Sequence, residues 1–191
     1  MNEITVQIEQ SIDYLKRVLA SPVIVSQISV IAERICRAYK DGKKLLLFGN
    51  GGSAADAQHL AAEMVSRFRL ERKALPALAL TTNSSVVTAI GNDYEYAVVF
   101  ARQVEALAEP GDIVIGISTS GNSENVRLGL AKAREKGACA VGLLGNEGGR
   151  VLKCCDIALV IPGTDTPRIQ EAHILLGHIL CDLVEKSLFG Q

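Results

Sequence analysis

The chain has 191 residues, of which 48% are hydrophobic and 21% charged, and its formal net charge is −1. This length suits one domain with a sizeable core. The near-neutral charge and the absence of tryptophan give no basis for nucleic-acid binding. The sequence shows neither a signal peptide nor a run of about 20 apolar residues, so we expect no export and no membrane segment. Five cysteines without a Cys-x-x-Cys motif indicate reduced thiols and a cytoplasmic location.

Two amphipathic helices are expected before the first strand. Apolar residues recur at three- and four-residue steps over residues 3–20, and a second such pattern runs from Pro22 to about Lys40. One layer of an α/β fold does not need both helices. We therefore predict that residues 1–40 also pack at an oligomer interface.

The rest of the chain alternates apolar strands with helices. This alternation predicts an α/β fold, with a three-layer, doubly wound, five-stranded parallel sheet in one domain over residues 1–191. Ligands bind such sheets at the C-terminal ends of the strands. The predicted strands are 45–48, 77–81, 113–117, 138–144 and 157–161, and the helices are 53–68, 84–90, 98–107, 124–136 and 168–188, with a break at 91–93 and a loop over 162–167.

A glycine-rich turn, Gly49-Asn-Gly-Gly-Ser-Ala54, directly follows the first strand and opens a helix. This order presents backbone N–H groups and a helix dipole to an anion. The turn also fits the dinucleotide fingerprint Gly-x-Gly-x-x-Gly/Ala. The second strand, however, ends in Thr81-Thr-Asn83, without the acidic residue that would bind a ribose, so nicotinamide binding is disfavoured. The lack of a following Gly-Lys-Ser/Thr excludes a nucleotide P-loop.

A second polar turn, Ser118-Thr-Ser-Gly-Asn-Ser123, follows the third strand. Helix capping is the default role of a residue such as Ser123. Four hydroxyl residues in six exceed what capping needs. Hydroxyls and backbone N–H groups at a helix start can surround a phosphate without any Lys or Arg. We predict that this turn binds a phosphate ester.

His59 and Glu63 are four residues apart and share one face of the helix after the glycine turn. Taken alone, this pair also fits a solvated helix face. On the last helix, Gln170 and His178 share a broad face, whereas His173 lies roughly 140° from His178 and is expected to be a core or supporting residue. If the two helices converge, these side chains make a nitrogen and oxygen site suited to zinc or a similar divalent ion.

These motifs, with Gly91-Asn-Asp93 and Arg168-Ile-Gln-Glu171, resemble those of bacterial phosphoheptose isomerases of the sugar-isomerase (SIS) fold, over essentially the whole chain. The resemblance implies isomerisation of sedoheptulose 7-phosphate to D-glycero-D-manno-heptose 7-phosphate, the first step of ADP-heptose synthesis. It implies a homotetramer with active sites between subunits. It also implies Glu63 as the base and His178 as its acid/base partner. The implied ligands of one zinc ion per subunit are His59, Glu63, Gln170 and His178. The implied substrate contacts are Asn50, Gly51, Gly52, Glu63, Asn92, Asp93, Ser118, Thr119, Ser120, Ser123 and Gln170.

Two other hypotheses remain open. A non-enzymatic SIS protein that binds the replication initiator DnaA resembles parts of the chain, such as Ala57-Gln-His59, but it lacks the acid and the second histidine supplied here by Glu63 and His178. A sugar-phosphate sensor would bind its ligand without chemistry. Such regulators usually carry a DNA-binding domain, which is not visible in this sequence. The segment 163–167 departs from the family pattern and is assigned no role.

Overall fold

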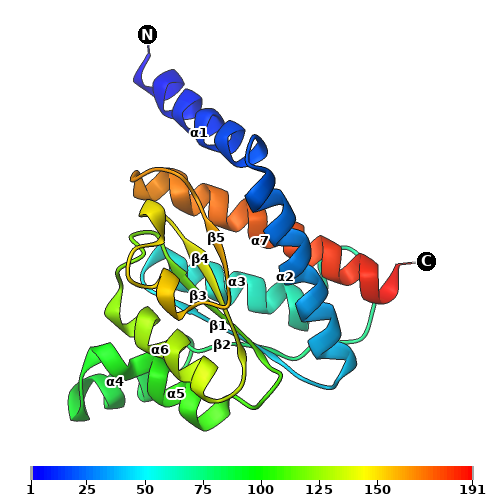
Figure 1. Cartoon of the computed structure of the whole chain (residues 1–191), viewed down its shortest axis with the longest axis vertical. Coiled ribbons are helices and arrows are strands. Elements are labelled where there is room, and N and C mark those ends of the chain that lie inside the picture. Colours follow the sequence, from blue (N-terminus) through cyan, green and yellow to red (C-terminus); the bar gives the residue numbers. More distant parts are fainter. Residues whose placement is uncertain (1, 191) are drawn as a thin grey trace.

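A parallel sheet of five strands forms the centre of the structure (Figure 1). The computed structural model describes residues 2–190. The strand order is β2-β1-β3-β4-β5, and every neighbouring pair is parallel, which confirms the predicted doubly wound α/β fold. The strands are β1 (Leu45–Gly49), β2 (Ala77–Ala79), β3 (Ile113–Ser118), β4 (Cys139–Leu144) and β5 (Ile157–Val160).

Helices cover both faces of this sheet, and three short 3-10 helices lie in the connections from β2 to β3 and from β4 to β5. Taken singly, none of the helices within residues 2–190 is long and apolar enough to cross a membrane; α1 and α2 pass such a test only as a pair, which bends by 74°. The α-helices are α1 (Glu3–Leu19), α2 (Pro22–Lys40), α3 (Gly52–Val65), α4 (Ser84–Asp93), α5 (Val99–Leu107), α6 (Glu124–Glu135) and α7 (Thr166–Phe189), and the 3-10 helices are Tyr96–Val98, Asn146–Gly148 and Leu152–Cys154.

The alternation of side chains along β1 divides the core into two layers. Leu45 and Leu47 pack in a cluster with α2, α3 and α7, whereas Leu46 and Phe48 pack in a second cluster with α5 and α6. Successive side chains of a strand point to opposite faces, so a strand covered on both sides is apolar throughout. All of β1 is buried, as the run of four apolar residues predicts.

Three helix boundaries differ from the sequence prediction by two residues or more. Helix α3 ends at Val65, three residues before its predicted end at Phe68. Helix α4 continues through Gly91-Asn-Asp93, which we expected to break it, because glycine inside a helix costs only about 1 kcal/mol relative to alanine. Helix α7 begins at Thr166, so Pro167 lies in its first turn and not in a loop. Proline is tolerated there because the N–H that it lacks has no partner in a first turn.

The strand order places a topological switch point between β1 and β3. The chain leaves β1 toward β2 on one side, and it continues from β3 toward β4 on the other. Ligands of open α/β sheets bind in the crevice at such a point, outside the carboxyl ends of the strands. Gly49, the first residue of the glycine turn, pairs in the sheet with Ile117, which directly precedes the serine turn. The glycine turn and the serine turn are therefore neighbours.

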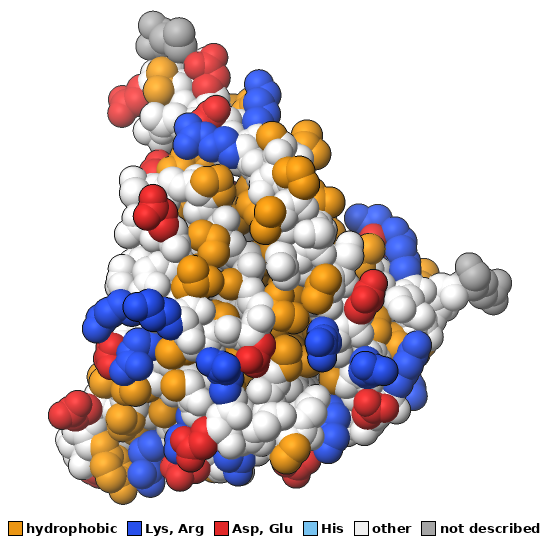
Figure 2. All heavy atoms as spheres, in the orientation of Figure 1, with side chains coloured by type: hydrophobic (Ala, Val, Ile, Leu, Met, Phe, Trp, Pro, Cys, Tyr) orange, Lys and Arg blue, Asp and Glu red, His pale blue; other side chains and the backbone are white. Residues whose placement is uncertain are grey.

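Helix α1 extends away from the sheet and carries an exposed apolar stripe (Figures 1 and 2). The exposed fractions of Ile4, Ile8 and Ile12 are 66%, 54% and 45%. The stripe continues onto α2, where Val23 is 66% exposed. Contiguous exposed apolar surface of this kind marks a site of association.

Candidate active site

The glycine turn lies against the side chain of Gln170 on α7. A Cβ atom placed on Gly52 would come within 2.4 Å of Nε2 of Gln170, so only a glycine allows this amide to rest on the backbone of the turn. Gly51 has a φ of 54°, in the region that favours glycine, and it provides no side-chain cap to α3. The turn and Gln170, predicted separately from the sequence, lie together.

Asn50 joins the glycine turn to the start of α6 by a pair of amide hydrogen bonds. Its Nδ2 donates to Oδ1 of Asn125 at 2.9 Å, and Nδ2 of Asn125 donates back to Oδ1 of Asn50 at 2.8 Å. The hydroxyl of Tyr96 donates to the same Oδ1 of Asn50 at 3.2 Å. The sequence analysis missed Asn125 and Tyr96. The only sequence signal for Asn125 is its place two residues after the serine turn.

The hydroxyls of the serine turn gather around Ser118. Oγ of Ser118 lies 3.0 Å from Oγ of Ser123 and 3.4 Å from Oγ of Ser120. Ser123 is the N-cap residue of α6, but its side chain makes no capping hydrogen bond. Its hydroxyl therefore faces the turn and does not serve the helix. Thr119 is partly buried beside Ser118, and its carbonyl oxygen lies against Gly145.

Three side chains converge where α3 packs against α7, two to three helical turns along α3 from the glycine turn. Nε2 of His59 lies 2.8 Å from Nε2 of His178, although the two residues are 119 apart in the chain. Nε2 of His59 also lies 3.3 Å from Oε1 of Glu63. One ligand atom from each residue lies within 4.8 Å of the others, and no other group of three or more His, Cys, Asp or Glu side chains in residues 2–190 has this spacing. The convergence that the sequence left open is present.

Two imidazole nitrogens and a carboxylate oxygen are donor types that zinc binds. The side chain of His59 is 48% exposed and that of Glu63 is 22% exposed, so the cluster is open to a ligand. The residues present therefore fit a divalent ion. Gln170 lies two turns before His178, about 12 Å along the axis of α7, and its amide rests against Gly52.

His173 belongs to the core, which is one of the two roles expected for it. It is 1% exposed, and its Nε2 lies 3.1 Å from the carbonyl oxygen of Leu144. Burial lowers the pKa of His173 to about 4, although the hydrogen bond to Leu144 acts in the opposite direction. The residue is neutral at physiological pH and takes no part in the cluster.

Asn92 and Asp93 lie in the last turn of α4, where Nδ2 of Asn92 donates to Oδ1 of Asp93 at 2.8 Å. Both are exposed. A Cβ atom on the neighbouring Gly91 would lie 3.9 Å from the ring of Tyr96, whose hydroxyl binds Asn50. The end of α4 thus lies near the glycine turn. Within the described residues no hydrogen bond or ion pair joins Asn92 or Asp93 to the histidine cluster.

Comparisons with known proteins identify the family of the chain. A family model described as SIS domain matches residues 8–145. A phosphoheptose isomerase of Clostridium acetobutylicum is 57% identical over 190 residues, which are 100% of this chain and 97% of the relative. A phosphoheptose isomerase of Geobacter sulfurreducens is 54% identical over 192 residues and is covered to 99%, as is this chain. The solved structure of a phosphoheptose isomerase from Neisseria gonorrhoeae superposes with a TM-score of 0.90 at 40% identity, over 96% of this chain and 97% of that one. The chain belongs to the phosphoheptose isomerase family of SIS-domain proteins.

Membership of the phosphoheptose isomerase family confirms the SIS fold and the resemblance found in the sequence. The comparisons give no support to the initiator-binding hypothesis. In this SIS domain the two polar turns follow the carboxyl ends of β1 and β3, and the histidine cluster lies further along α3, where that helix packs against α7.

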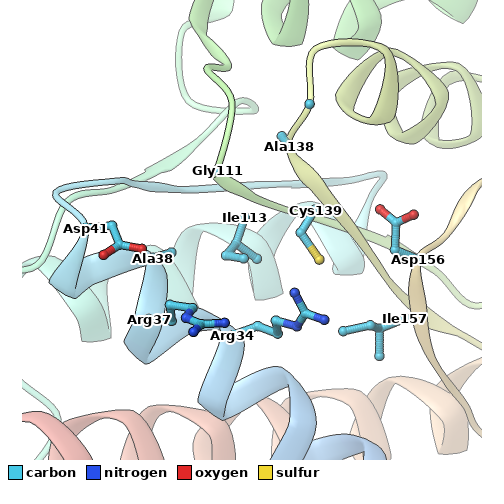
Figure 3. A pocket seen from close by; sticks show the side chains of 11 residues that line it. Arg34, Arg37, Ala38, Asp41, Gly111, Ile113, Ala138, Cys139, Asp156 and Ile157 are labelled. Carbon is cyan, nitrogen blue, oxygen red and sulfur yellow. The ribbon is translucent and has the colours of Figure 1, made fainter.

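A separate pocket of about 460 Å³ lies at the opposite, amino-terminal ends of the strands (Figure 3). Arg34 and Arg37 of α2, Cys139 of β4 and Asp156 line it. None of the predicted site residues reaches this pocket. Ligands of parallel α/β sheets bind at the other end of the strands, so we do not assign the reaction of a phosphoheptose isomerase to it.

The contact between Gly52 and Gln170 gives a direct test of the role of Gln170. Gly52→Ala should leave the free energy of unfolding within about 1 kcal/mol of wild type, because alanine favours a helix and only a flexible amide must move. Its methyl group should nevertheless displace the Gln170 amide and raise KM for the sugar phosphate at least about fivefold. Gly42→Ala is the control for a loss of stability without a change at the site, because Gly42 has a φ of 71° that strains an alanine but no atom within 4 Å of the added methyl group. An unchanged KM in Gly52→Ala would contradict a substrate role for Gln170.

Proposed function

We propose that the chain isomerises sedoheptulose 7-phosphate to D-glycero-D-manno-heptose 7-phosphate, the first step of ADP-heptose synthesis. One observation supports the assignment: Glu63 and His178 lie together, on the helix that the glycine turn opens and on the helix whose Gln170 contacts that turn. The names of relatives at 54–62% identity support the substrate. The serine turn, Ser118 to Ser123, is assigned to the phosphate, and Asn50, Gly51, Gly52, Asn92, Asp93 and Gln170 to the sugar.

Interconversion of a ketose and an aldose needs a base and an acid on neighbouring carbons. Glu63 removes a proton from C1, next to the C2 carbonyl, and the electrons of the broken C–H bond form an enediolate. His178 returns a proton to C2, and the hydroxyl proton of O1 passes to O2, so atoms and charge balance.

We assign a divalent ion, zinc by its donor types, to His59, Glu63, Gln170 and His178. When bound, such an ion supplies Lewis-acid polarisation of the substrate oxygens. A carboxylate that binds a metal is a weaker base. Oε1 of Glu63 is the oxygen directed toward His59, which leaves Oε2 for the proton.

A coupled assay for the heptose product, with and without a chelator, tests this function. We expect turnover of sedoheptulose 7-phosphate by metal-replete protein, loss of at least about 100-fold on chelation, and recovery with one zinc ion per subunit. Metal content measured by mass spectrometry on the same samples is the control. No turnover by metal-replete protein would remove the proposed reaction, and full activity without metal would remove the metal's role. Tight binding of the sugar phosphate without turnover would favour the sensor hypothesis.

We further propose a homotetramer with active sites between subunits, formed by one SIS domain over residues 1–191. The exposed stripe on α1 and α2 supports this assembly, because water-exposed isoleucine at 45–66% is stabilised by burial against another copy. The half-exposed His59 leaves room for a neighbouring subunit. Light scattering that gives a monomer mass would contradict the proposal. The five free cysteines support a cytoplasmic location.

A further inference from the structure

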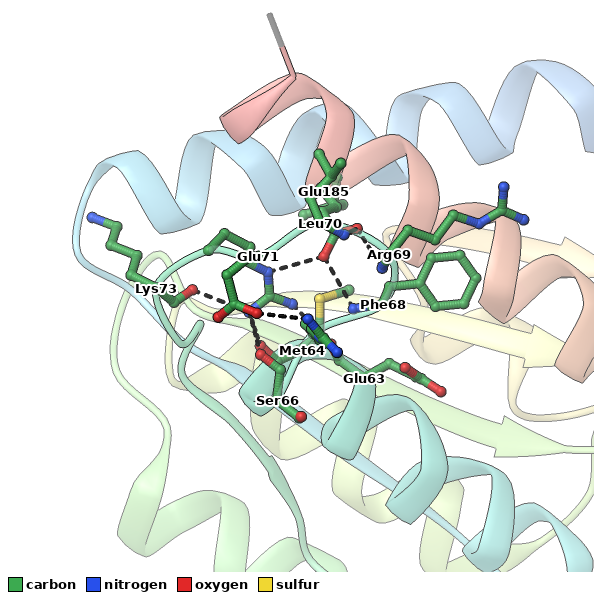
Figure 4. Close-up of polar contacts among 12 residues, drawn as sticks. Glu63, Met64, Ser66, Phe68, Arg69, Leu70, Glu71, Lys73 and Glu185 are labelled. Atoms are coloured by element: carbon green, nitrogen blue, oxygen red, sulfur yellow. Dashed lines mark hydrogen bonds and ion pairs between the residues drawn. The ribbon is translucent and has the colours of Figure 1, made fainter.

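A buried ion pair closes the loop that joins α3 to β2. Nε of Arg72 lies 3.1 Å from Oε1 of Glu185, near the end of α7, and each side chain is only 2% exposed. Figure 4 shows the carboxylate of Glu185 reaching from α7 onto the loop backbone. A buried pair is costly unless its remaining donors and acceptors are satisfied. Its hydrogen-bond partners therefore identify the segments that it fixes.

The carboxylate of Glu185 fixes the middle of the loop. It accepts hydrogen bonds from three consecutive backbone N–H groups, those of Phe68 at 3.0 Å, Arg69 at 2.7 Å and Leu70 at 2.8 Å. Burial acts to raise the pKa of Glu185, but these N–H groups and Arg72 outweigh it and hold the pKa below its usual value. The charged carboxylate ties the backbone at Phe68 to α7.

The guanidinium of Arg72 fixes the end of α3. Its Nη2 donates to the carbonyl oxygen of Glu63 at 2.8 Å, and its Nη1 donates to that of Met64 at 2.7 Å and that of Ser66 at 3.1 Å. The last carbonyls of a helix lack intrahelical partners and carry partial negative charge, so a cation is favourable there. The turn of α3 that carries Glu63 is thus attached, through Arg72, to Glu185 of α7.

The fixed loop brings Phe68 onto the histidine cluster. The ring of Phe68 stacks on the imidazole of His178, with centroids 5.7 Å apart and an angle of 28° between the rings. The imidazole of His59 meets the imidazole of His178 edge-on, with ring centroids 5.1 Å apart. The orientation of His178 is therefore set by contacts with both neighbours.

We propose that Arg72 and Glu185 are positioning residues that hold Glu63 and His178 in reacting geometry, with Phe68 as the contact that orients His178. Neither member of the pair touches the side chains of the cluster, because Arg72 reaches Glu63 only at its backbone carbonyl oxygen. Proton transfer depends on the placement of acid and base to within a fraction of an ångström, and side chains locked by a supporting layer supply that placement. This inference rests on the proposed function for its kinetic readout only.

Phe68→Leu tests the inference without disturbing the buried pair. We expect kcat to fall about three- to tenfold and KM to stay within about twofold, because an aromatic contact to the acid/base is lost and substrate contacts are kept. The pH profile of kcat should shift, and the affinity for zinc, measured by competition with a chromophoric chelator, should fall about tenfold, because a ligand that loses its supporting contact holds a metal less well. Phe68→Tyr, which keeps the ring, should restore all three. Arg67→Ala is the matched control, since Arg67 pairs only with the exposed Glu71 in the same loop.

Glu185→Gln tests the link between the pair and the cluster. We expect faster hydrogen exchange at the N–H groups of Phe68, Arg69 and Leu70, and the same loss of zinc affinity as in Phe68→Leu. Faster exchange with unchanged zinc affinity and kcat would overturn the inference, as would wild-type values in Phe68→Leu. If Glu185→Gln does not fold, Arg72→Lys takes its place, because it keeps a cation beside Glu185 but loses the fork of hydrogen bonds to α3. If the wild type turns over no sedoheptulose 7-phosphate, the proposed function fails and the zinc affinity still decides the positioning role.

Discussion

Glu63→Gln should lower kcat for sedoheptulose 7-phosphate by about 10²–10⁴-fold while the protein stays folded. The amide keeps the shape of the side chain but cannot accept a proton from carbon, and general base catalysis contributes this much to a proton transfer. Glu63 is partly exposed, with its side chain 22% accessible, so the change leaves no buried charge without a partner. Steady-state kinetics and thermal unfolding of the same preparation check both halves of the prediction.

Exchange with heavy water makes this test specific to the base. During turnover in heavy water the wild type should incorporate deuterium at C2 of the aldose, where His178 returns a proton, and at C1 of the recovered ketose when the first step reverses. Glu63→Gln should show neither label. Glu71→Gln is the control, because Glu71 is 84% exposed and its carboxylate pairs with Arg67, which is not a predicted site residue. Retention of full activity and of exchange by Glu63→Gln would remove the base assignment and leave His178 as the remaining candidate.

The buried neutral His173 should make the protein less stable as the pH falls. Its pKa is about 4 in the folded chain against an ordinary value of 6.5, so between these values the unfolded state binds a proton that the folded state does not. The free energy of unfolding therefore rises with pH through this window. We expect this histidine alone to contribute a loss of about 2–3 kcal/mol between about pH 7.5 and pH 4.5.

Urea unfolding of wild type and His173→Gln at several pH values isolates that contribution. The glutamine can still donate to the carbonyl oxygen of Leu144 but does not titrate, so the pH dependence of its stability should be weaker by the same amount. The carboxylate of Glu185, whose folded pKa lies below its usual value, loses its contribution only at lower pH. Parallel curves for the two proteins would show that His173 is not the group that titrates.

Most of the fold could be predicted from local patterns of apolar and polar residues. The unbroken apolar run at Leu45–Gly49 and the regular alternation of strands and helices were enough to predict a doubly wound parallel sheet. The errors occurred at helix ends. Thr166 belongs to α7 because proline is favourable in a first turn, and Gly91-Asn-Asp93 belongs to α4 because a glycine near a helix end costs only about 1 kcal/mol.

The sequence indicated which residues could form the candidate site, but not how they come together. The spacing of His59 and Glu63 put both on one face of α3, but their approach to His178, 119 residues after His59, depends on packing between α3 and α7. Asn125 and the Arg72–Glu185 pair were missed for the same reason, since their partners lie 75 and 113 residues away in the chain. Periodicity reports which face a residue is on and carries no information about what that face meets.

The register of Gly49 with Ile117 has a consequence for how this molecule tolerates change. The two turns that we assign to the sugar phosphate are spaced by main-chain hydrogen bonds of the sheet, whereas the proposed reacting groups, Glu63 and His178, are brought together by packing between α3 and α7. On this proposal, substitution of those two side chains would remove the reaction and leave the two turns intact. The protein would then bind a sugar phosphate without converting it.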